Sequence, residues 1–203
     1  METALDRIGE KHITNEGYEV EIIEYFSYNN CTIKFTDGHT VEKVSYGNIK
    51  RGFIKNKLHK SVYSIGYLGN GEYKCKTNGR ITPHYQVWKD LIKRCYYKYY
   101  LDINPTYIGV TVCEEWHNFQ NFAGWFEDNY KEGFELDKDL LVKGNKIYSP
   151  ETCCFVPQEI NLIFMSNRKK DKQHITHVAE KYKNKIKPKT YQALIDYEVE
   201  ITN

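Results

Sequence analysis

The segment "ELDKDLLVKGNKIYSPETCCFVPQEIN", residues 135–161, contains the signals of a small unit that combines strands with a helix. Its apolar side chains predict a strand over 134–142, and a Gly-containing run at 143–146 predicts a turn. A second strand is expected over 153–157, where a proline ends it, and a helix is expected over 158–167. The predicted order is therefore strand, long loop, strand and helix.

A unit of this kind can hold one divalent metal ion between its hairpin and its helix. Hydrolysis of a phosphodiester there requires a base that activates water, acidic or amide metal ligands, and Lys or Arg side chains that position the phosphate backbone. Asp137 on the first strand and Asn161 on the helix stand where the metal ligands are expected. The base is expected next to Asp137, and that position is Lys138.

The first 60 residues alternate between apolar and polar side chains. This period predicts strands over 18–26, 31–35 and 40–46, separated by turn signals at Asn29-Asn30 and Asp37-Gly38. Short strands joined by tight turns favour a small antiparallel β-barrel-like module.

After the Gly-rich residues 64–80 the period changes to that of helices. Helices are expected over 85–99, with Trp88, Leu91, Ile92, Cys95 and Tyr99 on one face, and over 114–130, with Trp116, Phe119, Phe122, Ala123 and Phe126 on one face. A short strand is expected between them at 109–113, and two tail helices over about 176–186 and 189–197.

The expected fold class is α+β, in which the N-terminal β-module is followed by helices and the β-hairpin–helix unit. We predict a β-module over 1–62, a Gly-rich connection over 63–84, an α+β domain over 85–170 and a helical tail over 171–203.

The formal net charge is only +2, so the global field favours no polyanionic partner. Two local runs are basic, at 50–60 and 167–172. Because phosphate contacts depend on Lys and Arg, these runs predict nucleic-acid binding, although a charge run is also typical of an ordinary solvated face. The candidate nucleic-acid-binding residues are Lys50, Arg51, Lys55, Lys57, Lys60, Arg168, Lys169 and Lys170.

The chain has no apolar run near its start and no stretch of about 20 apolar residues, so neither a signal peptide nor a membrane span is expected. The cytoplasm of a host cell is the expected location, and the six cysteines are expected to be reduced. Cys113 and His117 are four residues apart, but buried structural cysteines explain this spacing better than a zinc site.

Three stretches resemble a large group of phage and mobile-element HNH-like proteins: "YQVWKDLIKRCY", "YIGVTVCEEWHNFQNFAGWFEDN" and "LDKDLLVKGNKIYSPETCCFVPQEIN". Many members are described as HNH homing-type endonucleases of the ββα-metal fold. The resemblance covers most of residues 60–165, with the elements in the same order. It implies an HNH-like hairpin–helix unit, DNA as the partner and, in an active member, Mg²⁺ or another divalent metal as the cofactor.

The resemblance also assigns the site residues. Asp137 matches the Asp of the HNH pattern, Lys138 the catalytic His, Thr152 the central Asn, and Asn161 the helix residue. Two of these four positions therefore depart from the pattern, which makes the motif degenerate. A lysine is a cation at neutral pH and is a poor general base, but it can pair with a phosphate. Alternatively, Lys138 pairs with a neighbouring carboxylate in a purely structural hairpin.

Longer members of the group carry a plant-type ethylene-response-factor DNA-binding domain after the hairpin unit and end in a segment similar to "HVAEKYKNKIKPKTYQALIDYEVEIT". This chain keeps both ends and lacks the insert, with a junction near 166–173.

These observations favour an HNH-like nucleic-acid-binding protein with a degenerate nuclease unit. One alternative is an active metal-dependent endonuclease, in which His84, His117 or His174 enters the site and supplies the base. Another is a phage protein that binds and inhibits a host defence protein, because Tyr and Trp are frequent at such interfaces.

Overall fold

The computed structural model of the chain describes residues 7–165 and 171–197. It has a mixed α+β fold and divides into two compact units, Met1–His59 and Lys60–Asn203. The basic residues Arg168, Lys169 and Lys170 lie outside the described residues. No helix in the described part of the chain is long and apolar enough to cross a bilayer.

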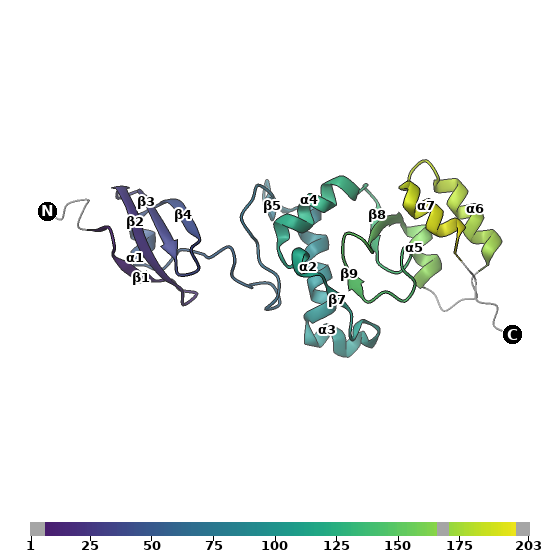
Figure 1. Cartoon of the computed structure of the whole chain (residues 1–203), viewed down its shortest axis with the longest axis horizontal. Coiled ribbons are helices and arrows are strands. Elements are labelled where there is room, and N and C mark those ends of the chain that lie inside the picture. Colours follow the sequence, from purple (N-terminus) through teal and green to yellow (C-terminus); the bar gives the residue numbers. More distant parts are fainter. Residues whose placement is uncertain (1–6, 166–170, 198–203) are drawn as a thin grey trace. The chain divides into compact units, whose positions relative to one another are not determined.

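The N-terminal unit is one four-stranded antiparallel sheet (Figure 1), followed by the short helix α1 (Tyr46–Lys50). Alternation of buried and exposed residues places Val20, Ile22, Ile33 and Phe35 in its core. The strands pair in the order β1-β2-β3-β4: β1 (Lys11–Ile13), β2 (Glu19–Ser27), β3 (Asn30–Phe35) and β4 (Thr40–Val44).

This sheet confirms the predicted antiparallel strands but not the barrel-like closure. Within the described residues of the unit, β1 and β4 pair only with β2 and β3 respectively, so the sheet is open. Register irregularities between Ile22 and Glu24 and between Cys31 and Ile33 bend the strands, as bulges do. After β4 the chain turns into α1 instead of returning to β1.

The C-terminal unit begins with a helical core. Trp88, Leu91 and Ile92 of the first long helix pack with Trp116 and with the apolar face of the helix Phe119–Asn129. The Trp88 indole N–H donates to the Trp116 carbonyl at 2.7 Å. The elements of this part are β5 (Lys76–Thr77), β6 (Arg80–Ile81), α2 (Pro83–Tyr96), α3 (Lys98–Ile103), η2 (Pro105–Tyr107), β7 (Thr111–Val112), η3 (Glu114–His117) and α4 (Phe119–Asn129).

Two predicted helices are each divided in the structure. The helix expected over 85–99 stops at Tyr96, since Tyr97 is extended, and Tyr99 is consequently 66% exposed instead of joining the core. The helix expected over 114–130 divides at Asn118, whose side chain caps α4 by accepting the Gln120 N–H.

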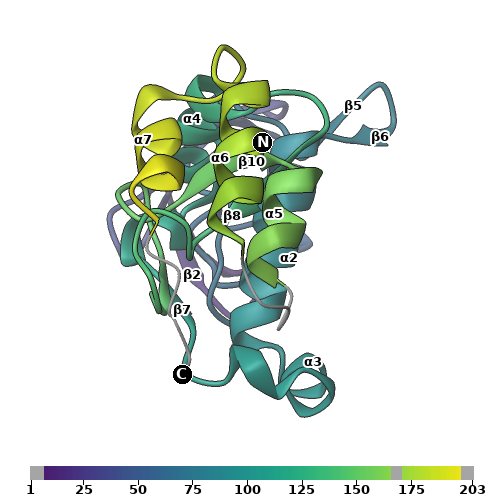
Figure 2. The same cartoon turned by 90° about the vertical axis from the view of Figure 1, so that its right-hand side faces the viewer.

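The remaining elements build the hairpin and the tail: β8 (Phe134–Asp137), β9 (Ile147–Tyr148), β10 (Cys154–Pro157), α5 (Gln158–Met165), α6 (Lys172–Tyr182) and α7 (Pro188–Ile195). Helices α6 and α7 pack against each other, and α6 also contacts α5 (Figure 2). The long loop between β8 and β10 contains β9, which pairs in parallel with β7. This pairing was not predicted, because it joins two strands of two residues each that are separated in the sequence by α4 and β8.

Candidate functional site

The strand, loop, strand and helix predicted for residues 134–167 are present as far as residue 165, and residues 166–167 lie outside the described part of the chain. Strands β8 and β10 pair antiparallel, with Asp137 opposite Cys154 and Phe134 opposite Pro157, and α5 follows β10 directly. β10 is buried along its whole length, whereas β8 directs Glu135 and Asp137 toward a cavity. The first strand is shorter than the predicted 134–142 and ends at Asp137.

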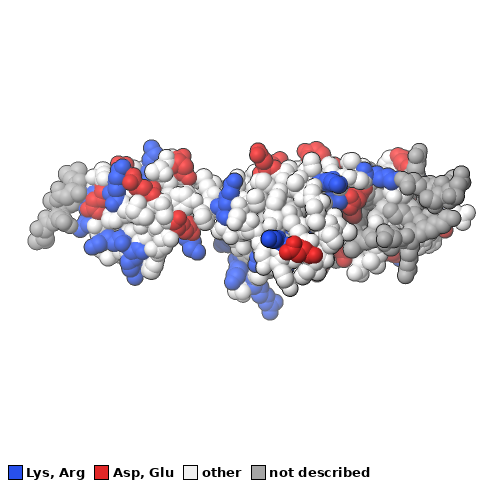
Figure 3. Space-filling model, turned by 90° about the horizontal axis from the view of Figure 1, so that it is seen from below, with Lys and Arg blue, Asp and Glu red and all other residues white. Residues whose placement is uncertain are grey.

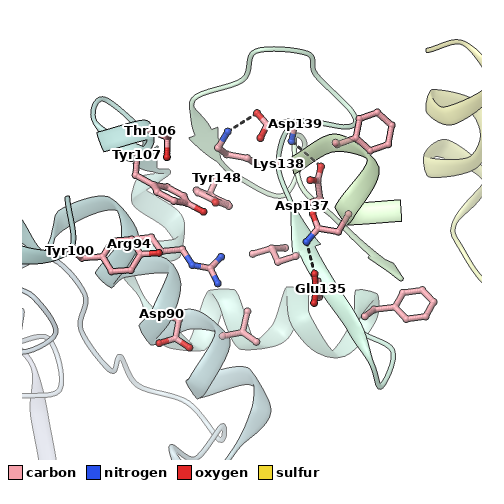
Figure 4. A pocket seen from close by; sticks show the side chains of 15 residues that line it. Asp90, Arg94, Tyr100, Thr106, Tyr107, Glu135, Asp137, Lys138, Asp139 and Tyr148 are labelled. Carbon is pink, nitrogen blue, oxygen red and sulfur yellow. Dashed lines mark hydrogen bonds and ion pairs between the residues drawn. The ribbon is translucent and has the colours of Figure 1, made fainter. Parts of the chain in front are cut away.

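This cavity has a volume of about 660 Å³, which is within the range of small-ligand sites. Its walls come from α2, α3, η2, β8, β9 and α5, so segments far apart in sequence meet around it (Figure 4). The polar groups that line it are Asp90, Arg94, Tyr100, Thr106, Tyr107, Glu135, Asp137, Lys138, Asp139, Tyr148 and Asn161.

Asp137 organises the turn that ends β8. Its Oδ1 atom accepts hydrogen bonds from the backbone N–H groups of Asp139, at 2.9 Å, and Leu140, at 2.7 Å. The residue is only 7% exposed, and this burial raises the pKa of its carboxyl above the usual value although the two donors oppose the shift. Asp137 therefore has a structural role in the hairpin besides facing the cavity.

Lys138, at the position of the expected base, is held by two acceptors. Its ammonium donates to the Asp139 carboxylate at 2.5 Å and to the Asn145 carbonyl at 2.8 Å, and its side chain is 12% exposed. An ammonium group has donors and no acceptor, so in this arrangement it cannot take a proton from water. The predicted pairing of Lys138 with a neighbouring carboxylate is confirmed.

Asn161 reaches the cavity from α5, and its amide nitrogen donates to the Glu135 carboxylate. The two predicted metal ligands, Asp137 and Asn161, thus line one cavity, but each already interacts with a group of the protein. Among the described residues, no group of three or more His, Cys, Asp or Glu side chains could hold a metal ion.

Thr152 lies apart from the cavity lining. Its hydroxyl donates to the Ile147 carbonyl at 2.7 Å and therefore supports the loop before β10. The residue that contacts the backbone of Lys138 is Asn145, whose amide nitrogen donates to the Lys138 carbonyl at 2.9 Å and to the Ile147 carbonyl at 2.7 Å. A Gly-Asn turn signal was visible in the sequence, but it did not indicate which backbone group the amide would reach.

Arg94 is the main functional candidate that the sequence reasoning missed. It belongs to α2, is half-buried, and directs its guanidinium into the cavity (Figure 4). The side chain of Tyr148 lines the cavity beside it, and this residue is 3% exposed and has a pKa that is raised by burial. The sequence contained only one indication of Arg94, which is that it is a cation on an amphipathic helix. The apolar face of this helix was assigned to the core, and nothing distinguished Arg94 from the other polar residues.

The three candidate histidines lie elsewhere. His84 contacts the Glu127 carboxylate and the Lys74 carbonyl, and His117 contacts the Tyr96 hydroxyl. Burial lowers the pKa of His117, which favours its neutral form. Neither of these residues, nor His174, is among the described residues that line the cavity.

The basic run 50–60 crosses the boundary between the two units. Lys50, Arg51, Lys55 and Lys57 are exposed in the N-terminal unit, whereas Lys60 begins the C-terminal unit. The Arg51 guanidinium lies 5.0 Å from the centre of the Phe53 ring, and Phe53 is 58% exposed. On the face shown in Figure 3, Lys and Arg are mixed with Asp and Glu over most of the surface, and one group of Lys and Arg near the middle of the lower edge has no acidic side chain among it.

Searches against protein-family models, curated proteins and solved structures found no match to this chain.

Proposed function

We propose that the chain is a nucleic-acid-binding protein whose HNH-like hairpin–helix unit has no nuclease activity. The observation that carries this proposal concerns Lys138, which the resemblance matches to the catalytic base and which donates to Asp139 and Asn145. The order of β8, β10 and α5, with Asp137 and Asn161 facing one cavity, supports an HNH-like unit.

Hydrolysis of a phosphodiester requires a base within hydrogen-bond reach of the attacking water. The described cavity lining provides no imidazole, and the Asp137 carboxylate is engaged by two backbone N–H groups. Burial raises the pKa of Asp137, and a higher pKa makes its carboxylate a stronger base. To activate a water molecule, however, the carboxylate would have to give up its hydrogen bonds with the two backbone N–H groups, and this would disturb the turn that ends β8. The arrangement therefore supports binding better than cleavage.

The N-terminal unit offers the surface for a phosphate backbone. Exposed and buried residues alternate along 51–57, and Arg51, Phe53, Lys55 and Lys57 are the exposed ones. Exposed cations next to an exposed aromatic ring are typical of surfaces that bind nucleic-acid strands, because the cations contact phosphates and the ring stacks on bases.

A plasmid-nicking assay tests the absence of cleavage. We expect no multiple-turnover nicking of supercoiled plasmid by the unaltered chain with Mg²⁺, Mn²⁺ or Ni²⁺. The control is Asp137→Asn, which keeps an acceptor for the two backbone N–H groups. Metal-dependent nicking that disappears in this control would overturn the proposal and support the active endonuclease.

A binding titration tests the nucleic-acid surface. The combined change of Lys50, Arg51, Lys55 and Lys57 to Ser should weaken binding of a labelled oligonucleotide, and each lost phosphate contact should flatten the log–log salt dependence by about one unit. A matched control removes the exposed cations Lys11 and Lys34 from the sheet of the same unit. Binding that is insensitive to salt, or equal in the two variants, would contradict the assignment of this surface.

A further inference from the structure

The charged groups that line the cavity are not all paired with protein groups of complementary charge or hydrogen-bonding character. Each carboxylate of the lining accepts a hydrogen bond from a protein donor: Asp90 from Gln86, Glu135 from Asn161, Asp137 from two backbone N–H groups and Asp139 from Lys138. In the described part of the chain, Arg94 forms no ion pair with a carboxylate, and the side chains of Tyr100, Tyr107 and Tyr148 line the cavity with it.

An enclosed guanidinium without a carboxylate partner retains N–H donors that suit an anion. Its planar donors match the geometry of a phosphate group, to which they can bond in pairs. Because burial removes part of its hydration, Arg94 gains more from an anionic ligand than an exposed arginine would. Four carboxylates also line the cavity, and each of them already accepts a hydrogen bond from a protein donor, which offsets part of their repulsion of an anion.

The walls beside Arg94 are aromatic. Tyr100 and Tyr107 lie with their ring centres 5.8 Å apart, and the Tyr148 ring lies 5.9 Å from the Lys138 ammonium. These rings and Arg94 line the same cavity (Figure 4). Tyrosine rings can stack on a base or a sugar, so the cavity suits a nucleotide better than free inorganic phosphate.

We propose that Arg94 binds the phosphate of a nucleotide that enters this cavity, with Tyr100 and Tyr107 contacting its base and sugar. This inference rests on the proposed nucleic-acid-binding function and assigns it a second, internal subsite. The exposed cations of the N-terminal unit would contact phosphates at the surface, whereas Arg94 would contact one phosphate inside the cavity.

The test is a calorimetric or NMR titration of the full chain with thymidine 5′-monophosphate in EDTA, with thymidine as the uncharged comparison. Arg94→Gln should weaken binding of the monophosphate by at least about tenfold, because a charge-assisted hydrogen bond is lost. Lys89→Gln removes a cation from the same helix outside the cavity lining and should leave the affinity unchanged. Thymidine should bind more weakly than the monophosphate to the unaltered chain.

Melting temperature separates a ligand-binding role from a structural one. Since Arg94 pairs with no carboxylate, Arg94→Gln should melt at or above the temperature of the unaltered chain, and Arg94→Lys should retain part of the monophosphate affinity. Equal monophosphate binding by the unaltered chain and Arg94→Gln, or no saturable binding up to about 10 mM, would overturn the inference. If oligonucleotide binding persists in that case, the proposed function stands and only the internal subsite is wrong.

Discussion

Asp37 in the N-terminal unit and Asp137 in the C-terminal unit form the same local hydrogen bond. Each carboxylate accepts the backbone N–H of the second residue after it, His39 or Asp139, and both distances are 2.9 Å. Asp37 also accepts from the side chain of Asn56 at 3.1 Å. Despite this likeness, the pKa of Asp37 is lowered and the pKa of Asp137 is raised.

The difference comes from the surroundings and not from the turn. Asp37 is exposed, so its hydrogen bond with the His39 N–H outweighs the small cost of desolvation. Asp137 is 7% exposed, and the cost of burying its charge exceeds the gain from two N–H donors. A short sequence signal therefore predicts the hydrogen bond, whereas packing determines whether the pKa of the carboxyl is raised or lowered.

The largest expected effect is the loss of folding stability when Asp137 is replaced, compared with the loss when Asp37 is replaced. Asp137→Ala should lower the free energy of unfolding by about 3 kcal/mol, because it leaves two buried N–H groups without an acceptor. Asp37→Ala should cost under about 1 kcal/mol, since water can replace the exposed carboxylate. Urea unfolding at pH 7 measures both, and equal losses would show that burial does not distinguish the two turns.

A second comparison concerns ion pairs in the two units. Lys138 and Asp139 are 12% and 48% exposed, whereas Lys11 and Glu19 are 59% and 41% exposed. Lys138→Met should lower the free energy of unfolding by about 1 kcal/mol, because the Asn145 carbonyl also loses its donor. Lys11→Met should cause no measurable change. A larger loss of stability for Lys11→Met than for Lys138→Met in the same unfolding assay would contradict the prediction that the less exposed ion pair contributes more.

The pH dependence of stability should have opposite signs at the two sites. The folded pKa of Asp137 lies above its ordinary value of 3.8, so its contribution to the free energy of unfolding decreases as pH rises from 3.8 through the folded pKa. The folded pKa of Asp37 lies below 3.8, so its contribution is complete above 3.8 and is lost as pH falls through the folded pKa.

Unfolding curves of Asp137→Asn and Asp37→Asn between pH 2 and pH 7 measure these contributions by difference from the unaltered chain. Asp137→Asn should remove a decline above pH 3.8, and Asp37→Asn should remove a loss below it. A loss of stability in acid that depends on Asp137 would contradict the sign assigned to its pKa.

The smallest expected effect is a change in pKa alone. Asn56→Ala removes the side-chain donor of Asp37 but leaves the His39 N–H, which is the largest cause of the lowered pKa. The pKa of Asp37 should rise only part of the way toward 3.8, and carboxyl NMR can follow it. A complete return to 3.8 would assign the shift to the side chain instead of the turn.

Much of the fold could be predicted because local patterns carry it. The alternation in 18–46 and the turns at Asn29-Asn30 and Asp37-Gly38 predicted three strands, all present with shifts of one or two residues. Aromatic spacing also identified Trp116, Phe119, Phe122 and Phe126 as core residues. The errors occur where a short polar signal interrupts a period, as at Asn118, and where two-residue strands pair across the unit, as β7 and β9 do.

From the sequence, only the residues on one wall of the candidate site could be predicted. Asp137, Lys138 and Asn161 lie in one continuous segment, and the structure places all three around one cavity. Arg94 and Tyr148 reach the same cavity from α2 and β9, and Asn145, not Thr152, contacts the Lys138 backbone. No local pattern distinguishes Arg94 from other cations on an amphipathic helix, because its importance depends on what packs opposite it.

The sequence by itself determined the periodicity, the turns and the chemistry available to the hairpin, including a lysine where a base is expected. These properties depend on neighbours within a few residues. Only the tertiary structure decided that Asp137 is buried while Asp37 is exposed and that Lys138 is held by Asp139 and Asn145. It also decided that Arg94 faces the cavity with no carboxylate partner among the described residues. The physical reason is that desolvation and pairing of charges depend on distant segments brought together by packing.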